Sequence, residues 1–208
     1  MIFVKTLRAH YRYVFTLFLG GASAVCNGGD FNEGFIWASK HAICTESADP
    51  YIAPTGKPYP PPPKLVCNMT ACADSDKVGI PQGEVIGHVY VPMKSEAALM
   101  AAVALGPVSV SVFGGALQNY RGGVMSGQCM TAQHGDHAML VVGYGTDAAT
   151  GLEFWKIKNS YGTAFGESGF MRLKRNDSVC GGATGLGGIG ILSGPGYPQV
   201  VYSGVHQK

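Results

Sequence analysis

The second half of the chain has the hydrophobic and polar patterning of β-strands. Val108–Val112 alternates strictly as Val-Ser-Val-Ser-Val, which predicts a strand with one buried face. Ala138–Gly143 is apolar throughout and bounded by glycine, which predicts a strand buried on both faces. Glu153–Lys158 and Gly169–Leu173 are two further predicted strands. Several strands separated by glycine turns favour an antiparallel, barrel-like β half.

The first half of the chain has helical patterning instead. Apolar residues at rough helical spacing predict a short helix over residues 32–42. A second helix is predicted over Ser95–Leu105, with Ser95 as its N-cap and Gly106-Pro107 ending it. Between them, seven prolines from Asp49 to Lys64 predict an extended surface loop. Helices followed by strands predict an α+β fold of one domain or two small lobes.

The composition narrows the class of protein. Charged residues make up 13% of the chain, about half the usual 25%. The net charge of +2 gives no basic footprint, so nucleic acid is not an expected partner. Six cysteines without zinc-site spacing favour disulfides, and the sequons Asn68-Met69-Thr70 and Asn176-Asp177-Ser178 agree with an oxidising compartment. These features predict an exported, β-rich protein.

Residues 1–25 resemble a secretory signal. Basic residues precede the apolar run Tyr13–Leu19, and Ala22-Ser23-Ala24 resembles a cleavage site. The run is too short to span a bilayer, so no stable membrane insertion is expected. The alternative is a spurious leader, and in either case this segment is set apart from the fold. The expected location is outside the cell or in a lysosome-like or vacuole-like compartment.

Two polar residues at strand ends are candidates for chemistry. His137 begins the apolar strand beside Asp136, where an imidazole could serve as a positioned base or as a structural, hydrogen-bonded residue. Asn159 lies at the end of the strand Glu153–Lys158. An amide on one imidazole nitrogen would fix the tautomer and leave the other nitrogen for a nucleophile. Asn159 could equally be a turn residue.

Three motifs in order give the chain a family resemblance. They are Cys26-Asn27-Gly28-Gly29, then Asp136-His137-Ala138 followed by Val142-Gly143-Tyr144-Gly145, then Lys158-Asn159-Ser160-Tyr161-Gly162. From Cys26 to about Val200 the chain resembles the papain family of cysteine peptidases, particularly its cathepsin L-like members. The resemblance implies a papain-like α+β fold, with a remnant of the helical lobe over about 26–80 and a β-rich lobe over about 81–200. Residues 201–208 form a tail.

The resemblance also implies roles for individual residues. His137 matches the catalytic imidazole and Asn159 the orienting amide, while Tyr161 and Phe165 take the places of aromatic residues that shield this amide from water. Cys129 and Cys180 match a disulfide of the second lobe. Residues implied in binding an extended peptide, by backbone contacts or as walls of a side-chain pocket, are Gly28, Gly29, Ser111, Asp136, Ala138 and Gly185. Partners would be polypeptide substrates or peptide-like inhibitors, with no cofactor and no metal.

A matching nucleophile is not found in these 208 residues. In this family the histidine lies roughly 130–150 residues after the catalytic cysteine, which from His137 leads to about position 7 or earlier. Residues 1–25 contain no cysteine, and Cys26 belongs to the later Gly-Gly motif. The sequence therefore predicts a peptidase relative that is N-terminally truncated, lacks the catalytic-cysteine segment and is inactive as written, with Cys26 as a free thiol. Cys44 departs from the family core and is expected to pair with Cys67 or Cys72.

Two other functions are compatible with the sequence. The first is a non-catalytic homologue that keeps a peptide groove and acts as a binding or decoy protein. The second is a metal site formed by Cys129, His134 and His137, which lacks regular ligand spacing and needs Cys129 as a free thiol.

Overall fold

A computed structural model describes residues 30–45, 47–48, 77–129, 135–180 and 186–201. The chain divides into two compact units. Unit 1 comprises residues 1–88 and 198–208, and unit 2 comprises residues 89–197. None of the described helices is both long enough and apolar enough to cross a membrane.

Unit 1 contains one described helix and a small sheet. Helix α2 (Phe31–Ala38) begins where the Asp30 carboxylate accepts a 2.7 Å hydrogen bond from the Asn32 N–H. Strands β1 (Ile43–Cys44) and β2 (Val78–Ile80) pair in antiparallel fashion. The helix is shorter than the predicted 32–42, because its last turn tightens where Lys40 donates to the carbonyl of Trp37.

The helix of unit 2 is the one that the sequence predicts over Ser95–Leu105. Helix α3 (Glu96–Leu105) starts where the Ser95 hydroxyl accepts from the Ala98 N–H at 3.2 Å, and Gly106 ends it. The expected N-cap and helix end are therefore confirmed. The helix is followed by β4 (Val108–Val112), the short 3₁₀ helix η3 (Gly114–Leu117) and β5 (Val124–Met125).

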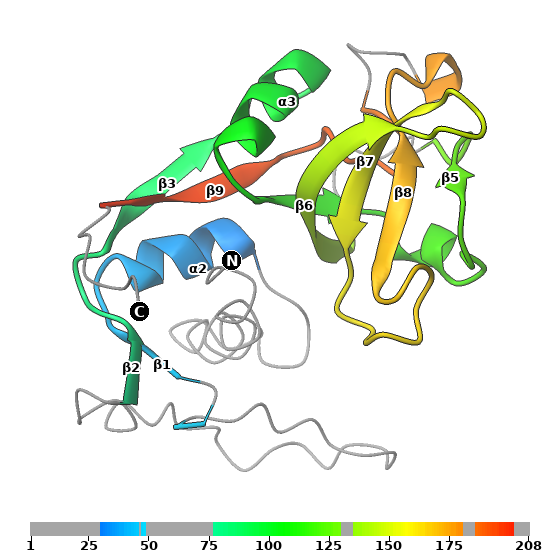
Figure 1. Ribbon diagram of the computed structural model, residues 1–208. Coiled ribbons are helices and arrows are strands. Elements are labelled where there is room, and N and C mark those ends of the chain that lie inside the picture. Colours follow the sequence, from blue (N-terminus) through cyan, green and yellow to red (C-terminus); the bar gives the residue numbers. More distant parts are fainter. Residues whose placement is uncertain (1–29, 46, 49–76, 130–134, 181–185, 202–208) are drawn as a thin grey trace. The chain divides into compact units, whose positions relative to one another are not determined.

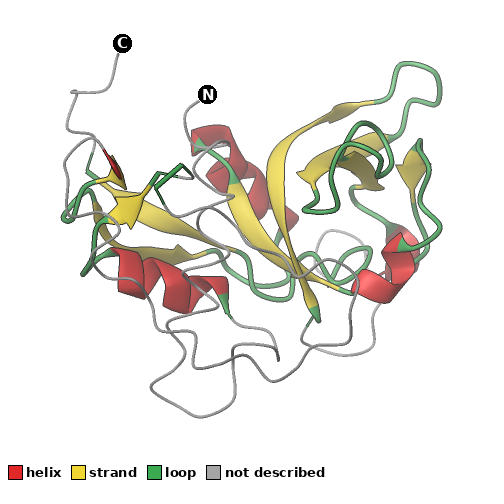
Figure 2. Cartoon of the chain, turned by 90° about the horizontal axis from the view of Figure 1, so that it is seen from below, coloured by secondary structure: helices red, strands yellow, loops and turns green. Residues whose placement is uncertain are grey.

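The remaining elements complete a mostly antiparallel sheet. They are β6 (His137–Thr146), β7 (Glu153–Lys158), β8 (Phe170–Lys174), the 3₁₀ helix η4 (Ser178–Cys180) and β9 (Gly196–Val200). With β3 (Val85–Tyr90), the strand order is β3-β9-β4-β6-β7-β8-β5, and the boundary between the units falls within β3 and β9. Figure 1 shows β6, β7 and β8 side by side. Figure 2 shows the loops, in green, that connect the strands, in yellow. The α+β class is confirmed.

Strand β6 runs further than predicted. The apolar pattern stops at Gly143, but the strand continues to Thr146 because a shift of register between Val141 and Gly143 lets the ladder to β7 resume. Met139, Leu140 and Val141 are buried as predicted, whereas Val142 and Gly143 are only partly buried. The prediction of a strand buried on both faces therefore holds only for its first half.

Each unit has its own hydrophobic core among the described residues. In unit 1 a small cluster joins Ala38, Ile43 and Val85, with Trp37 and Ile80 packed against it. In unit 2 the inner face of the sheet packs under α3. The largest fully buried side chains of this core are Leu99, Leu117, Trp155, Ile157, Met171, Leu173, Ile189, Ile191 and Leu192.

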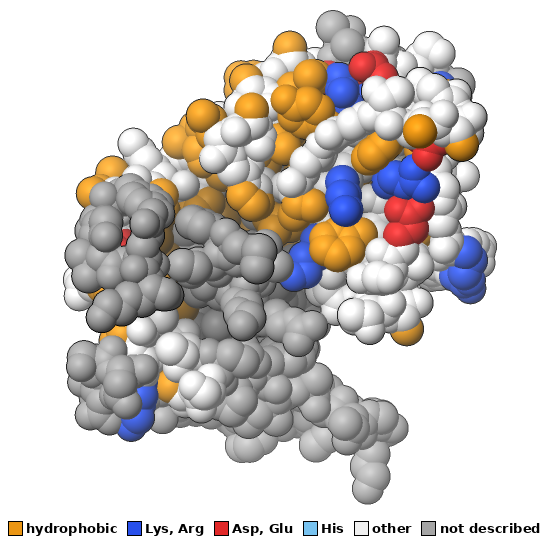
Figure 3. All heavy atoms as spheres, in the orientation of Figure 1, with side chains coloured by type: hydrophobic (Ala, Val, Ile, Leu, Met, Phe, Trp, Pro, Cys, Tyr) orange, Lys and Arg blue, Asp and Glu red, His pale blue; other side chains and the backbone are white. Residues whose placement is uncertain are grey.

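The opposite face of β7 and β8 carries cations over aromatic rings. Lys156 Nζ lies 5.2 Å from the centre of the Phe170 ring, and the Arg172 guanidinium lies 5.3 Å from the centre of the Phe154 ring. Figure 3 shows basic, acidic and hydrophobic side chains interspersed on this face. The long side chains thus cover apolar surface while their charges remain near water.

Candidate active site

His137 and Asn159 come from neighbouring strands of unit 2. His137 is the first residue of β6, and Asn159 directly follows the last residue of β7. Because the two strands are antiparallel, with Leu140 opposite Lys158, the start of one lies beside the end of the other. His137 Nε2 lies 2.9 Å from Asn159 Oδ1. The structure therefore brings together the two residues that the sequence singles out.

The hydrogen bonds at Asn159 determine the tautomer of the imidazole. Asn159 Oδ1 also accepts a 2.7 Å hydrogen bond from the backbone N–H of Ser160, so this atom must be the oxygen of the amide. An oxygen acceptor requires His137 Nε2 to be the donor. The neutral imidazole therefore carries its proton on Nε2, and Nδ1 keeps a lone pair that can accept a proton from a nucleophile.

The loop from β7 to β8 holds Asn159 in place. The Asn159 N–H donates to the carbonyl of Gly169 at 3.0 Å, which closes the loop on itself. Gly166 has φ +46°, and a Cβ at this position would lie 2.6 Å from the ring of Tyr120. Only glycine allows this close approach, so Gly166 lets the loop pack against the core. Asn159 itself is 6% exposed.

A charged cluster anchors the same loop. Glu167 accepts hydrogen bonds from the Gly123 N–H at 2.9 Å and from Arg172 Nη2 at 2.7 Å, and Arg172 also pairs with Asp147. The hydrogen bond from Arg172 is the main cause that lowers the pKa of Glu167. The hydroxyl and backbone N–H of Thr150, followed by Arg172, lower the pKa of Asp147 to about 2. Both acids therefore stay ionised at neutral pH and fix the end of the loop beside β8.

Aromatic rings pack beside the histidine. The Tyr161 ring centre lies 5.0 Å from that of His137, and Phe165 meets Tyr161 edge-on at 5.6 Å. Phe165 in turn contacts Tyr120 at 5.8 Å, which links the row of rings to the core. Tyr161 is 53% exposed. Their predicted role as a shield for Asn159 stays a prediction.

Asp136 and two glycines fix the backbone that enters β6. Asp136 Oδ1 accepts a 2.7 Å hydrogen bond from the Gly114 N–H, and the Asp136 N–H donates to Val112 O at 3.0 Å. A Cβ at Gly114 would lie 3.0 Å from His137 Cβ, and one at Gly135 would overlap the backbone of Val112. Neither glycine was identified from the sequence as a positioning residue. The one sequence feature that could have indicated them is their position, Gly114 just after one predicted strand and Gly135 just before the next.

The residues predicted to bind a peptide are only partly described. Ser111 and Ala138 face each other across the β4–β6 ladder, and both are partly buried. They lie next to Asp136 and His137 in register, so these four positions are grouped at one end of the two strands. Gly28, Gly29 and Gly185 lie outside the described residues.

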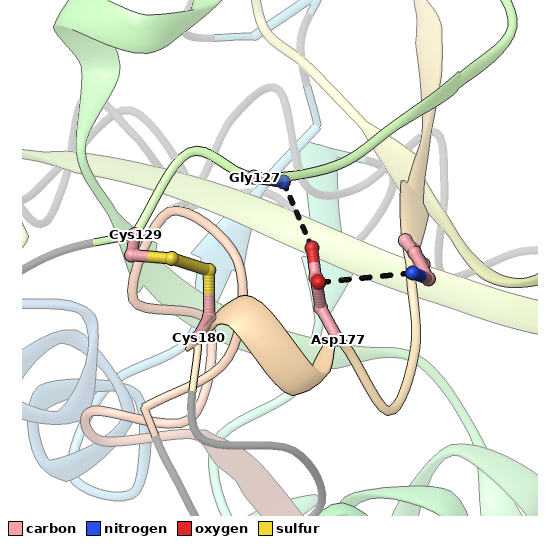
Figure 4. Close-up of a disulfide and its surroundings, with 5 residues drawn as sticks. Gly127, Cys129, Asp177 and Cys180 are labelled. Atoms are coloured by element: carbon pink, nitrogen blue, oxygen red, sulfur yellow. Dashed lines mark hydrogen bonds and ion pairs between the residues drawn. A yellow bond between two sulfur atoms is a disulfide. The ribbon is translucent and has the colours of Figure 1, made fainter.

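The predicted disulfide between Cys129 and Cys180 is confirmed. Figure 4 shows that Asp177 ties the same two segments together. The Asp177 carboxylate is 1% exposed, accepts a 2.8 Å hydrogen bond from the Gly127 N–H, and lies 3.8 Å from Lys174 Nζ. The segment after β5 is therefore held to the turn after β8 by one covalent and one polar link.

The disulfide contradicts the alternative of a metal site at Cys129, His134 and His137, because Cys129 is not a free thiol. Within the described ranges, no group of three metal-ligating side chains is found. Cys44 is disulfide-bonded, and its pairing with Cys67 or Cys72 stays a prediction. Its predicted partners Cys67 and Cys72, and the predicted free thiol Cys26, lie outside the described residues.

Comparison with known sequences places this geometry in a family. Residues 20–186 match the family described as papain family cysteine protease. The senescence-specific cysteine protease SAG39 of Oryza sativa is 39% identical over 169 residues, covering 80% of this chain and 44% of the relative. The thiol protease SEN102 of Hemerocallis is 37% identical over 163 residues, covering 77% and 40%. The chain spans less than half the length of these relatives.

Solved structures agree with the sequence comparison. The bromelain protease of Ananas comosus, in complex with the E64 inhibitor, matches with a TM-score of 0.69 and 25% identity over 96% of this chain and 88% of that chain. Digestive procathepsin L 3 of Tenebrio molitor matches with a TM-score of 0.69 and 30% identity, over 91% and 54%. With the family match, the fold and the ordered motifs in agreement, this chain belongs to the papain family of cysteine proteases.

Proposed function

We propose that unit 2 supplies the histidine and asparagine of a papain-type active site that acts on polypeptides. The observation that carries this proposal is the 2.9 Å hydrogen bond from His137 Nε2 to Asn159 Oδ1. This bond holds the imidazole in the tautomer whose Nδ1 can accept the proton of a thiol. The family membership of the chain supports the same roles.

The chemistry needs a thiolate that we propose is absent from these 208 residues. Cys129 and Cys180 are joined to each other, and Cys44 is also disulfide-bonded. Cys26, Cys67 and Cys72 all lie closer to His137 in the sequence than the family's spacing of roughly 130–150 residues, so none of them is expected to take the catalytic place. We therefore expect residues 1–208 alone to be inactive towards peptides, because a peptidase of this type attacks through a cysteine ion-paired with the histidine.

Given a cysteine in reach, the steps follow from the geometry. His137 Nδ1 would take the thiol proton, and the sulfur would attack the scissile carbonyl carbon to form a C–S bond. The imidazolium would then donate its proton to the leaving amine as the C–N bond breaks. Water, deprotonated by the same nitrogen, would hydrolyse the thioester and restore the thiol. Asn159 would keep Nε2 protonated throughout, without adding charge.

The expected setting is a secretory or vacuole-like compartment. The disulfides at Cys129–Cys180 and Cys44 support an oxidising environment. The bromelain structure in complex with E64 supports a peptide-like ligand for this family. The alternative function is a peptide-binding or decoy homologue, which would bind peptides without cleaving them.

The proposal is tested by joining these residues to a segment that carries a catalytic cysteine. A chimera would join the segment of the Oryza sativa relative that precedes its matched region to residues 26–208 of this chain. We expect residues 1–208 alone to give no hydrolysis of a fluorogenic peptide, and the chimera to give hydrolysis. In the chimera, His137→Ala should lower kcat/KM by on the order of 10²–10⁴-fold. The control His41→Ala, in unit 1, should leave kcat/KM unchanged.

Two results would contradict the proposal. One is a chimera whose activity does not depend on His137. The other is labelling of a cysteine in residues 1–208 by a thiol-directed peptide epoxide, with loss of a peptidase activity of that chain. Peptide binding by residues 1–208 together with an inactive chimera would favour the binding homologue.

A further inference from the structure

The sequon Asn176-Asp177-Ser178 spans the end of the turn after β8 and the first residue of η4. Its two outer residues, Asn176 and Ser178, are exposed, whereas Asp177 between them is 1% exposed. The turn therefore anchors the middle residue inward and leaves accessible the asparagine and the hydroxyl residue that a sequon requires.

The hydrogen bonds and ion pair of the sequon are made by the backbone of Asn176 and by Asp177. The Asn176 N–H donates to Glu96 Oε1 at 2.7 Å, and Asp177 binds the Gly127 N–H and pairs with Lys174. Within the described residues, the side chains of Asn176 and Ser178 make no hydrogen bond. A substituent on the Asn176 amide would thus break no hydrogen bond of the described residues.

Backbone conformation explains only part of this motif. Asn176 has φ +48°, a left-handed conformation that asparagine tolerates better than most residues. This conformation favours asparagine at position 176 but requires nothing of position 178. The serine two residues later is therefore not explained by the turn.

The neighbouring disulfide points to the compartment in which sequons are modified. Cys180 is two residues beyond Ser178 and is bonded to Cys129. Disulfides of this kind form in secretory compartments, and asparagine glycosylation occurs there too. The disulfide is therefore compatible with passage through a compartment in which asparagine is glycosylated.

From these observations we propose that Asn176 is an N-glycosylation site. The donor would be an oligosaccharide linked through pyrophosphate to a membrane lipid. The Asn176 Nδ2 atom would form a bond to C1 of the first sugar and lose a proton, while the bond from C1 to the lipid pyrophosphate breaks and the pyrophosphate leaves. This modification is independent of whether the chain hydrolyses peptides.

The test is expression of all 208 residues behind an added secretion signal in a eukaryotic host. Peptide N-glycosidase releases N-glycans and converts the carrier asparagine to aspartate, so mass spectrometry of the Asn176 peptide reads occupancy directly. We expect occupancy in the wild type and in Asn68→Gln, which removes the other sequon. Occupancy at position 176 should be lost in Asn176→Gln and Ser178→Ala, and retained in Ser178→Thr.

Glycans are scored on total cell protein, so a variant that folds poorly is still informative. An Asn176 peptide that is wholly unmodified in chains bearing the Cys129–Cys180 disulfide would overturn the proposal. Glycan found only on Asn68 would overturn it too, as would an occupancy of Asn176 that Ser178→Ala leaves unchanged.

Discussion

At the scale of single residues, the buried oxygens of Asn159 and Glu96 have defined hydrogen-bond donors. Asn159 Oδ1 receives two hydrogen bonds, from His137 Nε2 and from the Ser160 N–H, and both fix the same orientation of the amide. Glu96 is similarly placed at 5% exposure, where it accepts from the Asn176 N–H and lies 4.0 Å from Arg175 Nε. A buried carboxylate of this kind makes stability depend on pH.

Glu96→Gln should change the pH dependence of stability. Burial raises the pKa of Glu96 above its ordinary value of 4.5, against the opposing effects of the Asn176 N–H and Arg175. The folded protein therefore binds this proton more tightly than the unfolded chain, and its stability falls as the pH rises from the ordinary pKa through the raised one. The variant cannot lose a proton here, so its melting temperature relative to wild type should increase across this window.

Thermal unfolding of both proteins from about pH 4 to pH 7 measures this difference. Glu33→Gln, at an exposed position of α2, corrects for the loss of one negative charge. The raised pKa of Glu96 would be contradicted if the difference in melting temperature between Glu96→Gln and wild type stayed constant with pH. It would also be contradicted if the melting temperature of the variant fell relative to wild type as the pH rises.

At the scale of elements, close backbone contacts set the start of β6. A Cβ at Gly135 would lie 2.5 Å from Ser111 Oγ and 2.5 Å from Val112 O. Val112 is opposite His137 in the β4–β6 ladder, so a displacement of the Val112 backbone would also move His137 in the candidate active site. The absence of a side chain at position 135 is thus a condition for the geometry of His137.

Gly135→Ala should therefore destabilise the protein, whereas Gly143→Ala should not. Overpacking at position 135 is expected to lower the free energy of unfolding by about 1–3 kcal/mol. Gly143 lies in the same strand, but a Cβ there would meet no atom within 4 Å, so its replacement should change stability by less than about 0.5 kcal/mol. Urea unfolding measures both values, and equal costs would show that the contact at 135 is easily relieved.

The disulfide and Asp177 join the segment after β5 to the turn after β8. The Cys129–Cys180 bond closes a loop with a sequence separation of 51, for which a stabilisation of about 2–4 kcal/mol is typical. The hydrogen bond from Gly127 to Asp177 joins the same segments two residues earlier on one side and three on the other. Because the two links share one restraint, their contributions are not expected to add.

The elements that the sequence predicts well are those with local signals. Helix α3 has a serine cap and a Gly-Pro end, and β4 alternates strictly, so their bounds follow from the residues themselves. The end of α2 and the length of β6 depend on a tightened turn and a register shift, which arise from contacts with other segments. The hydrophobic pattern along the chain does not predict contacts of this kind.

The candidate site shows the same division. His137 and Asn159 stand out by motif, but their meeting depends on the antiparallel register of β6 and β7. The pairing of Cys129 with Cys180 is predicted only by resemblance to a family, since six cysteines allow many pairings. The anchoring of the loop by Glu167 and Arg172 has no signal in the sequence, because charged pairs of this kind follow no pattern along a loop.

At the scale of the whole molecule, the two units have cores of unequal size. The core of unit 2 includes 18 buried residues, whereas the described cluster of unit 1 has three. Hydrophobic stabilisation follows the apolar area removed from water. Unit 2 therefore has the larger source of stability among the described residues.

Hydrogen exchange should report this inequality. We expect the amides of β6, β7 and β8 to exchange more slowly than those of α2, β1 and β2, because the former open only when the larger core opens. Exchange measured by mass spectrometry or NMR at constant pH checks the order. Equal exchange rates for the two groups of amides would indicate that the units open together.

The positions of the two tryptophans allow the fluorescence of each unit to be measured separately. The chain has two tryptophans, Trp37 in unit 1 and Trp155 in unit 2. Trp155 is fully buried, whereas Trp37 is partly exposed and stacks on His41 with ring centres 4.3 Å apart. An indole in an apolar interior emits at shorter wavelength than a hydrated one. Trp37→Phe or Trp155→Phe leaves one emitter, and each unit then carries its own fluorescent reporter without a chemical label.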